Sequence, residues 1–346
     1  MIEVYNKALD SSIKVDRILG KIEGAKPGPT VVFFGGIHGN ETSGVFALKD
    51  ALACVNKTYV KGTIYGISGN LKALKKHIRF VQDDLNRLWT KLQIQKIKDK
   101  TVLNEDETEL LELLTVLEEI LKTNQPPFYF IDLHTTSSKT LPFITVNDAL
   151  INRKFSEQFP VPIVLGIEEY LNGPLLSYIN KMGYVSLGFE SGQHDDFSAI
   201  TNSIAFVYLA LVYSGVLKEE AVINFKKYHE QLKEQANKNN TVFEVVYLHK
   251  IKKNERFKML NGFKSFELIK KGTKLAMSNA VEIESPYDGS IFMPLYQKRG
   301  AEGFFIIKPI KPFFLKLSAG LRRIKTDNLL ALLPGISWVS KNEGVL

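Results

Sequence analysis

Residues 29–44 read PTVVFFGGIHGNETSG, beginning with an apolar run that is bounded by Pro29 and the glycine pair Gly35 and Gly36. Such a run predicts a strand that is buried on both faces of a sheet. The glycines let the backbone turn sharply at the end of that strand and approach a ligand closely. His38 and Glu41 follow the turn, three residues apart, where an imidazole and a carboxylate can reach one metal ion from the same side.

Further apolar runs alternate with helical patterns along the first two-thirds of the chain. These runs cover residues 62–69, 126–134, 161–167 and 184–190. Alternation of strands with helices is typical of an α/β sheet that is covered on both faces. We therefore expect one α/β domain over residues 1–235.

The clearest helix is expected over residues 104–123. Asn104 can cap its amino end, and Glu107 stands at the third helical position. Leucines recur at helical spacing and predict one buried stripe made of Leu110, Leu111, Leu114, Leu117 and Leu121.

Beyond about residue 235 the pattern changes to short β-branched and aromatic runs, separated by turns such as Tyr287-Asp288-Gly289. This pattern predicts a small β domain over residues 236–346. Residues 219–240, which straddle that boundary, are expected to hold a last, partly exposed helix.

Composition narrows the class of protein. The net charge of +8 favours anionic partners, but the lysines are scattered and no basic stripe is interleaved with aromatic residues. We therefore expect small carboxylate substrates rather than nucleic acid.

The longest apolar run, residues 204–217, is too short to span a bilayer and predicts a core helix. Without a secretory signal at the amino end, a cytoplasmic protein is expected.

The single cysteine, Cys54, excludes an intramolecular disulfide and a cysteine zinc cluster. Its apolar surroundings predict a buried structural thiol. Oligomeric state is left open by the sequence, and a homo-oligomer is one possibility.

A third metal ligand follows another apolar run. Asp132-Leu133-His134 ends that run, so His134 is also expected at the carboxyl end of a strand, where open α/β sheets build their sites. Two histidines and a glutamate form a ligand set that leaves catalytic zinc an open position for water. The alternative is that His134 is merely a polar strand terminus that faces solvent.

Three further motifs add charged groups. Arg87 in Asp84-Leu85-Asn86-Arg87, and Arg79 eight residues before it, present planar donor forks that suit carboxylates and oxyanions. Glu190 closes the run at residues 184–190 and can exchange protons with a zinc-bound water. Taken singly, each has an ordinary alternative as a surface charge.

As a set, the motifs GGIHGNE, DLNR with its earlier arginine, DLH and a strand-end glutamate resemble the succinylglutamate desuccinylase/aspartoacylase family of the zinc carboxypeptidase-like superfamily. The resemblance covers about residues 30–195. It implies a mixed, mostly parallel central sheet with helices on both faces, and a small C-terminal all-β domain that caps the site.

The resemblance also implies roles for individual residues. One zinc ion per chain would be bound by His38, Glu41 and His134, and Glu190 would be the general base and acid.

The same resemblance implies that Arg79 polarises the scissile carbonyl, while Asn86 and Arg87 hold the carboxylate of the substrate. Family members also use a tyrosine of the C-terminal domain, for which Tyr287 and Tyr296 are the candidates here. His194 receives no role from the resemblance.

The predicted activity is zinc-dependent cleavage of an N-acyl amino acid that carries a carboxylate, such as N-succinylglutamate or N-acetylaspartate. The alternatives are a zinc carboxypeptidase that acts on short peptides and a metal-binding module without catalysis. Glu190 and Arg79 beside the three ligands argue against the last, since a storage site needs neither.

Overall fold

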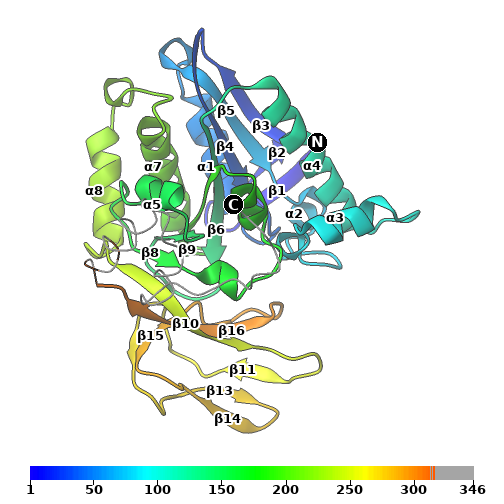
Figure 1. Cartoon of the computed structure of the whole chain (residues 1–346), viewed down its shortest axis with the longest axis vertical. Helices are drawn as coiled ribbons and strands as arrows, with labels where there is room; N and C mark the ends of the chain where they lie inside the picture. Colours follow the sequence, from blue (N-terminus) through cyan, green and yellow to red (C-terminus); the bar gives the residue numbers. More distant parts are fainter. Residues whose placement is uncertain (312, 314, 316–346) are drawn as a thin grey trace, which may run out of the picture.

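The computed structural model describes residues 1–311 together with Phe313 and Leu315, so the end of the predicted β domain lies outside the described residues. Figure 1 shows a layered upper body, with helices on both sides of a sheet, and a lower lobe of strands. The lobe comprises residues 242–309. The predicted fold class, an α/β fold with a mixed central sheet and helices on both faces, is confirmed, and two small antiparallel sheets accompany the central one.

The central sheet has 11 strands in the order β12-β15-β16-β10-β8-β7-β9-β6-β4-β5-β3. Its members are β3 (Ile18–Glu23), β4 (Lys26–Gly35), β5 (Lys61–Ser68), β6 (Phe128–Thr136), β7 (Phe143–Val146), β8 (Ile163–Leu165), β9 (Val185–Gln193), β10 (Val242–Lys250), β12 (Leu268–Ile269), β15 (Gly289–Phe292) and β16 (Glu302–Pro309). Among the strands before residue 235, β4 pairs in parallel with β5 and β6, β6 with β9, and β7 with β8. Within the central sheet before residue 235, only the pairs β3–β5 and β7–β9 are antiparallel.

The remaining strands form two smaller sheets. One has two strands, β1 (Ile2–Asn6) and β2 (Ser11–Val15). The other has three strands, β11 (Phe257–Met259), β13 (Lys274–Ser278) and β14 (Val281–Glu284).

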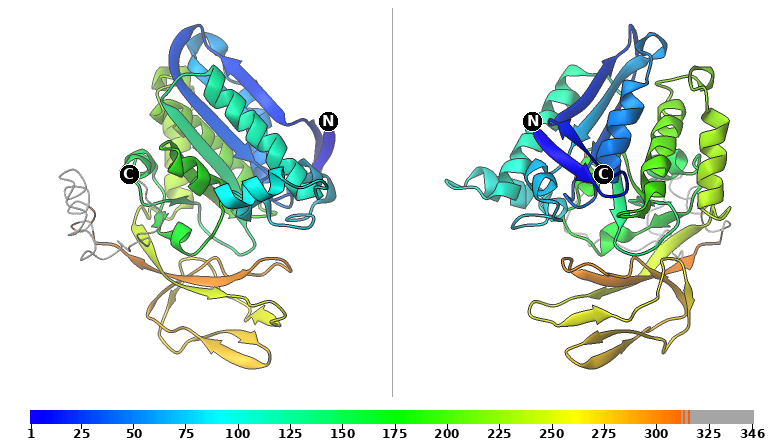
Figure 2. Two further views of the ribbon diagram at one scale, coloured as in Figure 1. Left: turned by 45° about the vertical axis from the view of Figure 1, so that its right-hand side comes forward. Right: turned by 180° about the vertical axis from the view of Figure 1, so that it is seen from behind.

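Helices cover both faces of the part of the central sheet that lies in the upper body (Figure 2). The helices are α1 (Ser43–Ala53), α2 (Leu71–Lys76), α3 (Lys91–Lys98), α4 (Glu105–Thr123), α5 (Leu150–Ser156), α6 (Leu175–Lys181), α7 (Phe197–Tyr213) and α8 (Phe225–Gln235). Short 3₁₀ helices are η1 (Lys57–Tyr59), η2 (Leu85–Arg87), η3 (Ile167–Glu169) and η4 (Glu219–Ala221). None of the described helices combines the length and apolar character that a membrane span requires.

Strand β4 explains why residues 31–34 are apolar without interruption. Val31 and Phe33 belong to the core beneath α1 and α7, whereas Val32 and Phe34 belong to the core beneath α4 and α6. Side chains alternate along a strand, so a strand between two helical layers buries every position.

The lower lobe contains only strands among its described elements after α8. It is not a separate sheet, however, because β10 pairs in parallel with β8 and antiparallel with β16. The central sheet therefore continues from the helical body into the lobe (Figure 1). The domain boundary at residue 235 remains a prediction.

Two predictions about helices need correction. Residues 204–217 are not one helix, because α7 covers Phe197–Tyr213 and ends before the turn at Gly215. The buried face of α4 consists mainly of Leu110, Leu113, Leu114, Leu117 and Ile120, so the stripe is rotated from the predicted one. The Asn104–Glu107 capping box is present as expected.

Cys54 is exposed, so the prediction of a buried thiol was wrong. It follows the last residue of α1 as its C-cap, where the apolar pattern of the helix no longer determines burial.

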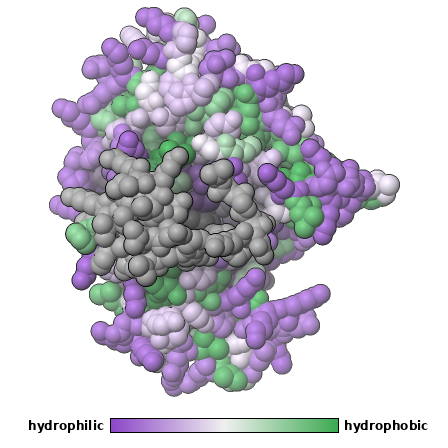
Figure 3. All heavy atoms as spheres, in the orientation of Figure 1, coloured by the Kyte–Doolittle hydropathy of each residue, from purple (hydrophilic) through white to green (hydrophobic). Residues whose placement is uncertain are grey.

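On the face in Figure 3, hydrophilic residues are spread widely and no single hydrophobic patch dominates the coloured surface.

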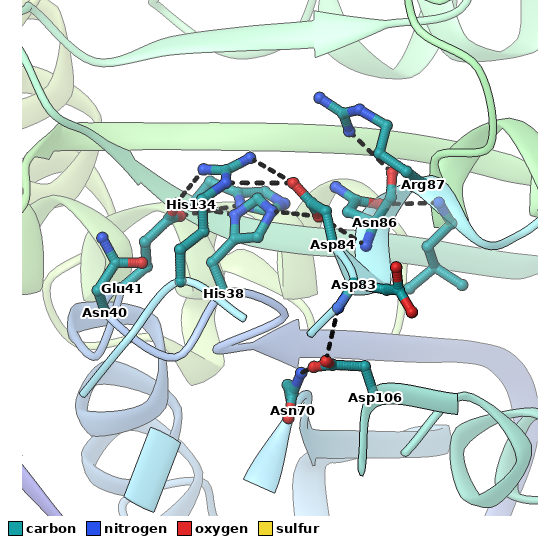
Figure 4. A network of polar contacts seen from close by, with 12 residues as sticks. His38, Asn40, Glu41, Asn70, Asp83, Asp84, Asn86, Arg87, Asp106 and His134 are labelled. Carbon is teal, nitrogen blue, oxygen red and sulfur yellow. Dashed lines mark hydrogen bonds and ion pairs between the residues drawn. The ribbon is translucent and has the colours of Figure 1, made fainter. Parts of the chain in front are cut away.

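Asp106 fastens a loop that leads to the candidate site. Its buried carboxylate, at the amino end of α4, accepts backbone N–H bonds from Val81 at 3.2 Å, Gln82 at 2.6 Å and Asp83 at 2.9 Å. It also accepts a bond from Asn70 Nδ2 at 2.6 Å, as Figure 4 shows. The helix end thereby holds the chain directly before Asp84.

Asp106→Ala should lower the free energy of unfolding by about 3 kcal/mol, since these donors lose a charged acceptor. Chemical denaturation measures the change. Glu105→Ala, in the same helical turn but in an ion pair with Lys76 at the surface, should cost less than about 1 kcal/mol. Equal losses in the two variants would contradict the role given to Asp106.

Candidate metal centre and substrate pocket

The turn after β4 brings His38 and Glu41 to the edge of the sheet. Gly36 has a φ of +76°, which only glycine adopts easily, and a Cβ on Gly39 would lie 2.1 Å from the backbone carbon of Ala73. The turn is fixed by a bond from the Gly39 N–H to the Arg79 carbonyl at 3.1 Å. Both glycines are therefore required by geometry.

The three predicted metal ligands lie together. One ligand atom from each of His38, Glu41 and His134 lies within 4.8 Å of the others, and all three residues are buried. His38 Nδ1 is 2.8 Å from Glu41 Oε1, and His134 Nδ1 is 3.0 Å from Glu41 Oε2 (Figure 4). The cluster forms because β4 and β6 are parallel neighbours whose carboxyl ends meet at one edge.

Two aspartates support the histidines. His38 Nε2 lies 3.2 Å from Asp84 Oδ1, and His134 Nε2 lies 2.6 Å from Asp132 Oδ2. In each ring, Nε2 thus faces an aspartate and Nδ1 faces Glu41. Carboxylates commonly orient metal-binding histidines in this way. The site fits a divalent cation such as zinc on this donor set.

The sequence analysis gave no role to Asp84 and Asp132. A signal was present, because the two residues open the motifs DLNR and DLH. Spacing alone did not indicate that each would contact a histidine.

Burial and charge shift the acidities in this cluster. Burial alone would raise the pKa of Glu41, but His38 and His134 hold that pKa well below its ordinary value. Burial likewise opposes ionisation of Asp84, but Arg79 and His38 hold its pKa well below the usual range. Burial lowers the pKa of His134, yet Asp132 and Glu41 raise it well above that of a free imidazole. Both carboxylates are therefore charged and able to act as ligands or orienting groups.

Arg79 lies directly beside the cluster. Its Nε and Nη2 donate to Asp84 Oδ2 at 3.1 and 3.0 Å, and its Nη1 is 3.6 Å from Glu41 Oε1. Although burial alone would lower it, Asp84 and Glu41 raise the pKa of the Arg79 guanidinium. A fixed positive charge therefore stands next to the predicted metal ligands.

Glu190 lies on β9, where its backbone is paired with His134 on one side and Phe143 on the other. It is 7% exposed, and its Oε2 has no hydrogen-bond partner among the described residues. Burial raises the pKa of Glu190 to about 7. A buried carboxyl with this acidity can accept or donate a proton near neutral pH.

Asn86 and Arg87 lie on η2 at the side of the same pocket. Asn86 Oδ1 accepts the Leu175 N–H at 2.9 Å. Arg87 donates from Nε and Nη2 to Glu302 Oε1 at 3.3 and 3.0 Å. Glu302, at the start of β16, was missed by the sequence analysis, since 215 residues separate it from Arg87 and no motif contains it.

One pocket contains all seven predicted site residues. Its lining includes His38, Glu41, Arg79, Asn86, Arg87, His134 and Glu190. The lobe contributes to the wall through Met293, Leu295, Gln297, Gly300, Glu302 and Phe305.

Neither candidate tyrosine lines this pocket. The Tyr296 hydroxyl donates to the Leu260 carbonyl at 2.8 Å, and the Tyr287 ring packs near Tyr247. Among the described residues, the pocket contains no tyrosine.

His194, which had no predicted role, lies beside the cluster instead of in the pocket wall. Its Nδ1 is 2.7 Å from Thr135 Oγ1, and its Nε2 is 3.4 Å from both Asn40 Nδ2 and Gln297 Oε1. Burial lowers the pKa of His194. The ring therefore connects the metal-site turn to the loop of the lobe.

Known proteins resemble this chain in sequence family and in fold. The family model described as the succinylglutamate desuccinylase/aspartoacylase catalytic domain matches residues 27–206, just over half of the chain. No curated protein matches the chain by sequence.

Solved structures share the fold. A succinylglutamate desuccinylase/aspartoacylase from Rhodobacter sphaeroides is 16% identical, with a TM-score of 0.63 and coverage of 84% of this chain and 88% of that one. The product-bound ectoine utilisation protein EutE from Ruegeria pomeroyi is 17% identical, with a TM-score of 0.63 and coverage of 83% and 87%. Succinylglutamate desuccinylase from Vibrio cholerae is 13% identical, with a TM-score of 0.60 and coverage of 90% and 92%. By the match of its catalytic domain, the chain belongs to the succinylglutamate desuccinylase/aspartoacylase family.

Proposed function

We propose that this protein is a zinc-dependent amidohydrolase that removes the acyl group from an N-acyl amino acid bearing a carboxylate. The observation that supports this most strongly is the buried cluster of His38, Glu41 and His134 with Glu190 beside it. Glu190 also presents a carboxylate oxygen that has no partner among the described residues.

Zinc would be held by His38, Glu41 and His134, and when bound it supplies a Lewis acid that polarises a carbonyl and makes water more acidic. The chain itself supplies the proton acceptor. Glu190 takes the proton from the attacking water and later gives it to the leaving amine, a role that suits a carboxyl whose pKa is about 7.

Arg79 supplies a second positive charge near the reacting carbonyl. Its bonds to Asp84 fix the guanidinium before the substrate arrives, so stabilising a developing oxyanion needs little rearrangement. Removal of Asp84 would therefore disturb both His38 and Arg79.

Arg87 would hold the carboxylate of the substrate and so align the amide with Glu190. The substrate then shares this guanidinium with Glu302, or displaces Glu302 from it. The alternative, a carboxypeptidase, would use the same groups to cleave a short peptide.

The metal assignment is tested by elemental analysis of purified variants. Wild type should hold about one zinc per chain, and His38→Ala should hold almost none because a three-ligand site loses a ligand. Asp132→Asn should weaken zinc affinity by about 10- to 100-fold, since it loosens the orientation of His134. His229→Ala, on α8, is the control and should bind zinc like wild type. Normal zinc content in His38→Ala would place the ligands elsewhere.

The base assignment is tested by Glu190→Gln, which keeps the size of the side chain but removes its proton acceptor. We expect kcat to fall by about 10²-fold or more while zinc content and thermal stability stay unchanged. Glu230→Gln, at an exposed position on α8, should leave kcat unaltered. Turnover within a few-fold of wild type would exclude Glu190 as the base.

The carboxylate contact is tested with a good substrate and the same molecule with its α-carboxylate amidated. Arg87→Ala should lower kcat/KM by about 10²-fold on the carboxylate and far less on the amide. Arg87→Lys should restore only part of the loss, because an ammonium lacks the planar fork. Equal proportional losses on both molecules would mean that Arg87 acts through the structure of the site.

A further inference from the structure

The pocket beyond the charged centre has an aliphatic wall. Its side chains come from β7, from the stretch that runs from η3 into α6, and from the lobe. They are Val146, Ile167, Leu171, Pro174, Leu176, Met293 and Leu295, together with the aromatic Phe305. Among them, Ile167, Leu171, Leu176, Met293 and Leu295 are only partly buried. Partly exposed aliphatic groups gathered in a concave site are the usual contact surface for an apolar part of a ligand.

The cations in the pocket already have carboxylate partners. Among the described residues that line it, the only lysine or arginine side chains are Arg79 and Arg87. Arg79 is bound to Asp84, and Arg87 to Glu302. One substrate carboxylate at Arg87 would therefore use the last guanidinium, and a second would meet no other lysine or arginine among the described residues that line the pocket.

Several polar side chains of the pocket already donate to acceptors within the protein. A hydroxyl has one hydrogen to donate. Thr136 donates it to the Ser138 carbonyl at 2.7 Å, and Ser186 to the Leu176 carbonyl at 3.0 Å. Asn147 Nδ2 donates to Ser177 Oγ at 3.2 Å. These donors serve the protein itself.

We infer that the substrate carries a single carboxylate and that the rest of it, side chain or acyl chain, is uncharged and apolar. This inference rests on the proposed function and narrows it, away from dicarboxylic molecules such as N-acetylaspartate. A second carboxylate would lose its water against aliphatic groups and be repelled by Glu302, whereas an alkyl or aryl group gains from burial at the same surface.

Isosteric substrate pairs test the inference on the zinc-loaded protein. For the side chain, N-acetylleucine is compared with N-acetylaspartate. For the acyl chain, N-(4-methylpentanoyl)glycine is compared with N-succinylglycine. In each pair an isopropyl group replaces a carboxylate of similar shape. The apolar member should have the higher kcat/KM in at least one pair, by about 10²-fold. A preference for the acidic member, or parity, in both pairs would overturn the inference.

Binding to the zinc-loaded Glu190→Gln protein, measured by calorimetry, separates this inference from the proposed function. If wild type cleaves none of the four compounds but the apolar members bind more tightly, the proposed hydrolysis fails and the apolar subsite stands. If cleavage occurs and the acidic members bind equally well or better, the hydrolase stands and the apolar subsite fails.

A variant can reverse the selectivity. Leu176→Arg places a cation in the aliphatic wall and should raise kcat/KM on the acidic member of the selective pair by about tenfold relative to the apolar one. Leu92→Arg, on α3 and 67% exposed, is the matched control and should leave the ratio as in wild type. Zinc content and thermal stability show that each variant is folded. An unchanged ratio in folded Leu176→Arg would mean that this wall does not contact the substrate.

Discussion

The carboxylate of Glu41 joins the parts of the site. It contacts His38 through one oxygen and His134 through the other, and it accepts the N–H of Thr135 at 3.0 Å. The turn after β4 and the end of the neighbouring parallel strand β6 are thereby held together, with Arg79 close by. A buried negative charge of this kind is stable only when it is surrounded by partners, and two of those partners, His38 and His134, are the other proposed metal ligands.

The sequence predicted those contacts that follow from strand order. His38, Glu41 and His134 could be placed together because the carboxyl ends of parallel neighbours meet at one edge of a sheet. The pairing of Arg87 with Glu302 could not be predicted, because the residues are joined only through the fold of the lobe. The exposure of Cys54 and the rotation of the α4 stripe were missed for a related reason: small shifts in packing decide which residues near a helix boundary are buried.

The amino end of α4 contributes both to the stability of the fold and to the geometry of the candidate site. The capping box of that helix and the carboxylate of Asp106 are local features that the sequence explains well. Through the backbone of residues 81–83, they also position Asp84, which contacts both His38 and Arg79. Residues at a helix end that do not line the pocket thus help to orient side chains that do.

The continuity of the sheet between body and lobe has a mechanical consequence. Val242, Phe243 and Glu244 of β10 are in register with Ile163, Val164 and Leu165 of β8. A hinge that swung the lobe away as a rigid unit would shear this ladder and open the core beneath it. The loop between β15 and β16, which carries Leu295 and Gln297 of the pocket lining, is the part of the lobe that can move without disturbing this ladder. Loop movements are generally faster than domain closure, and a movement confined to this loop would leave the sheet edge that carries His38, Glu41 and His134 in place.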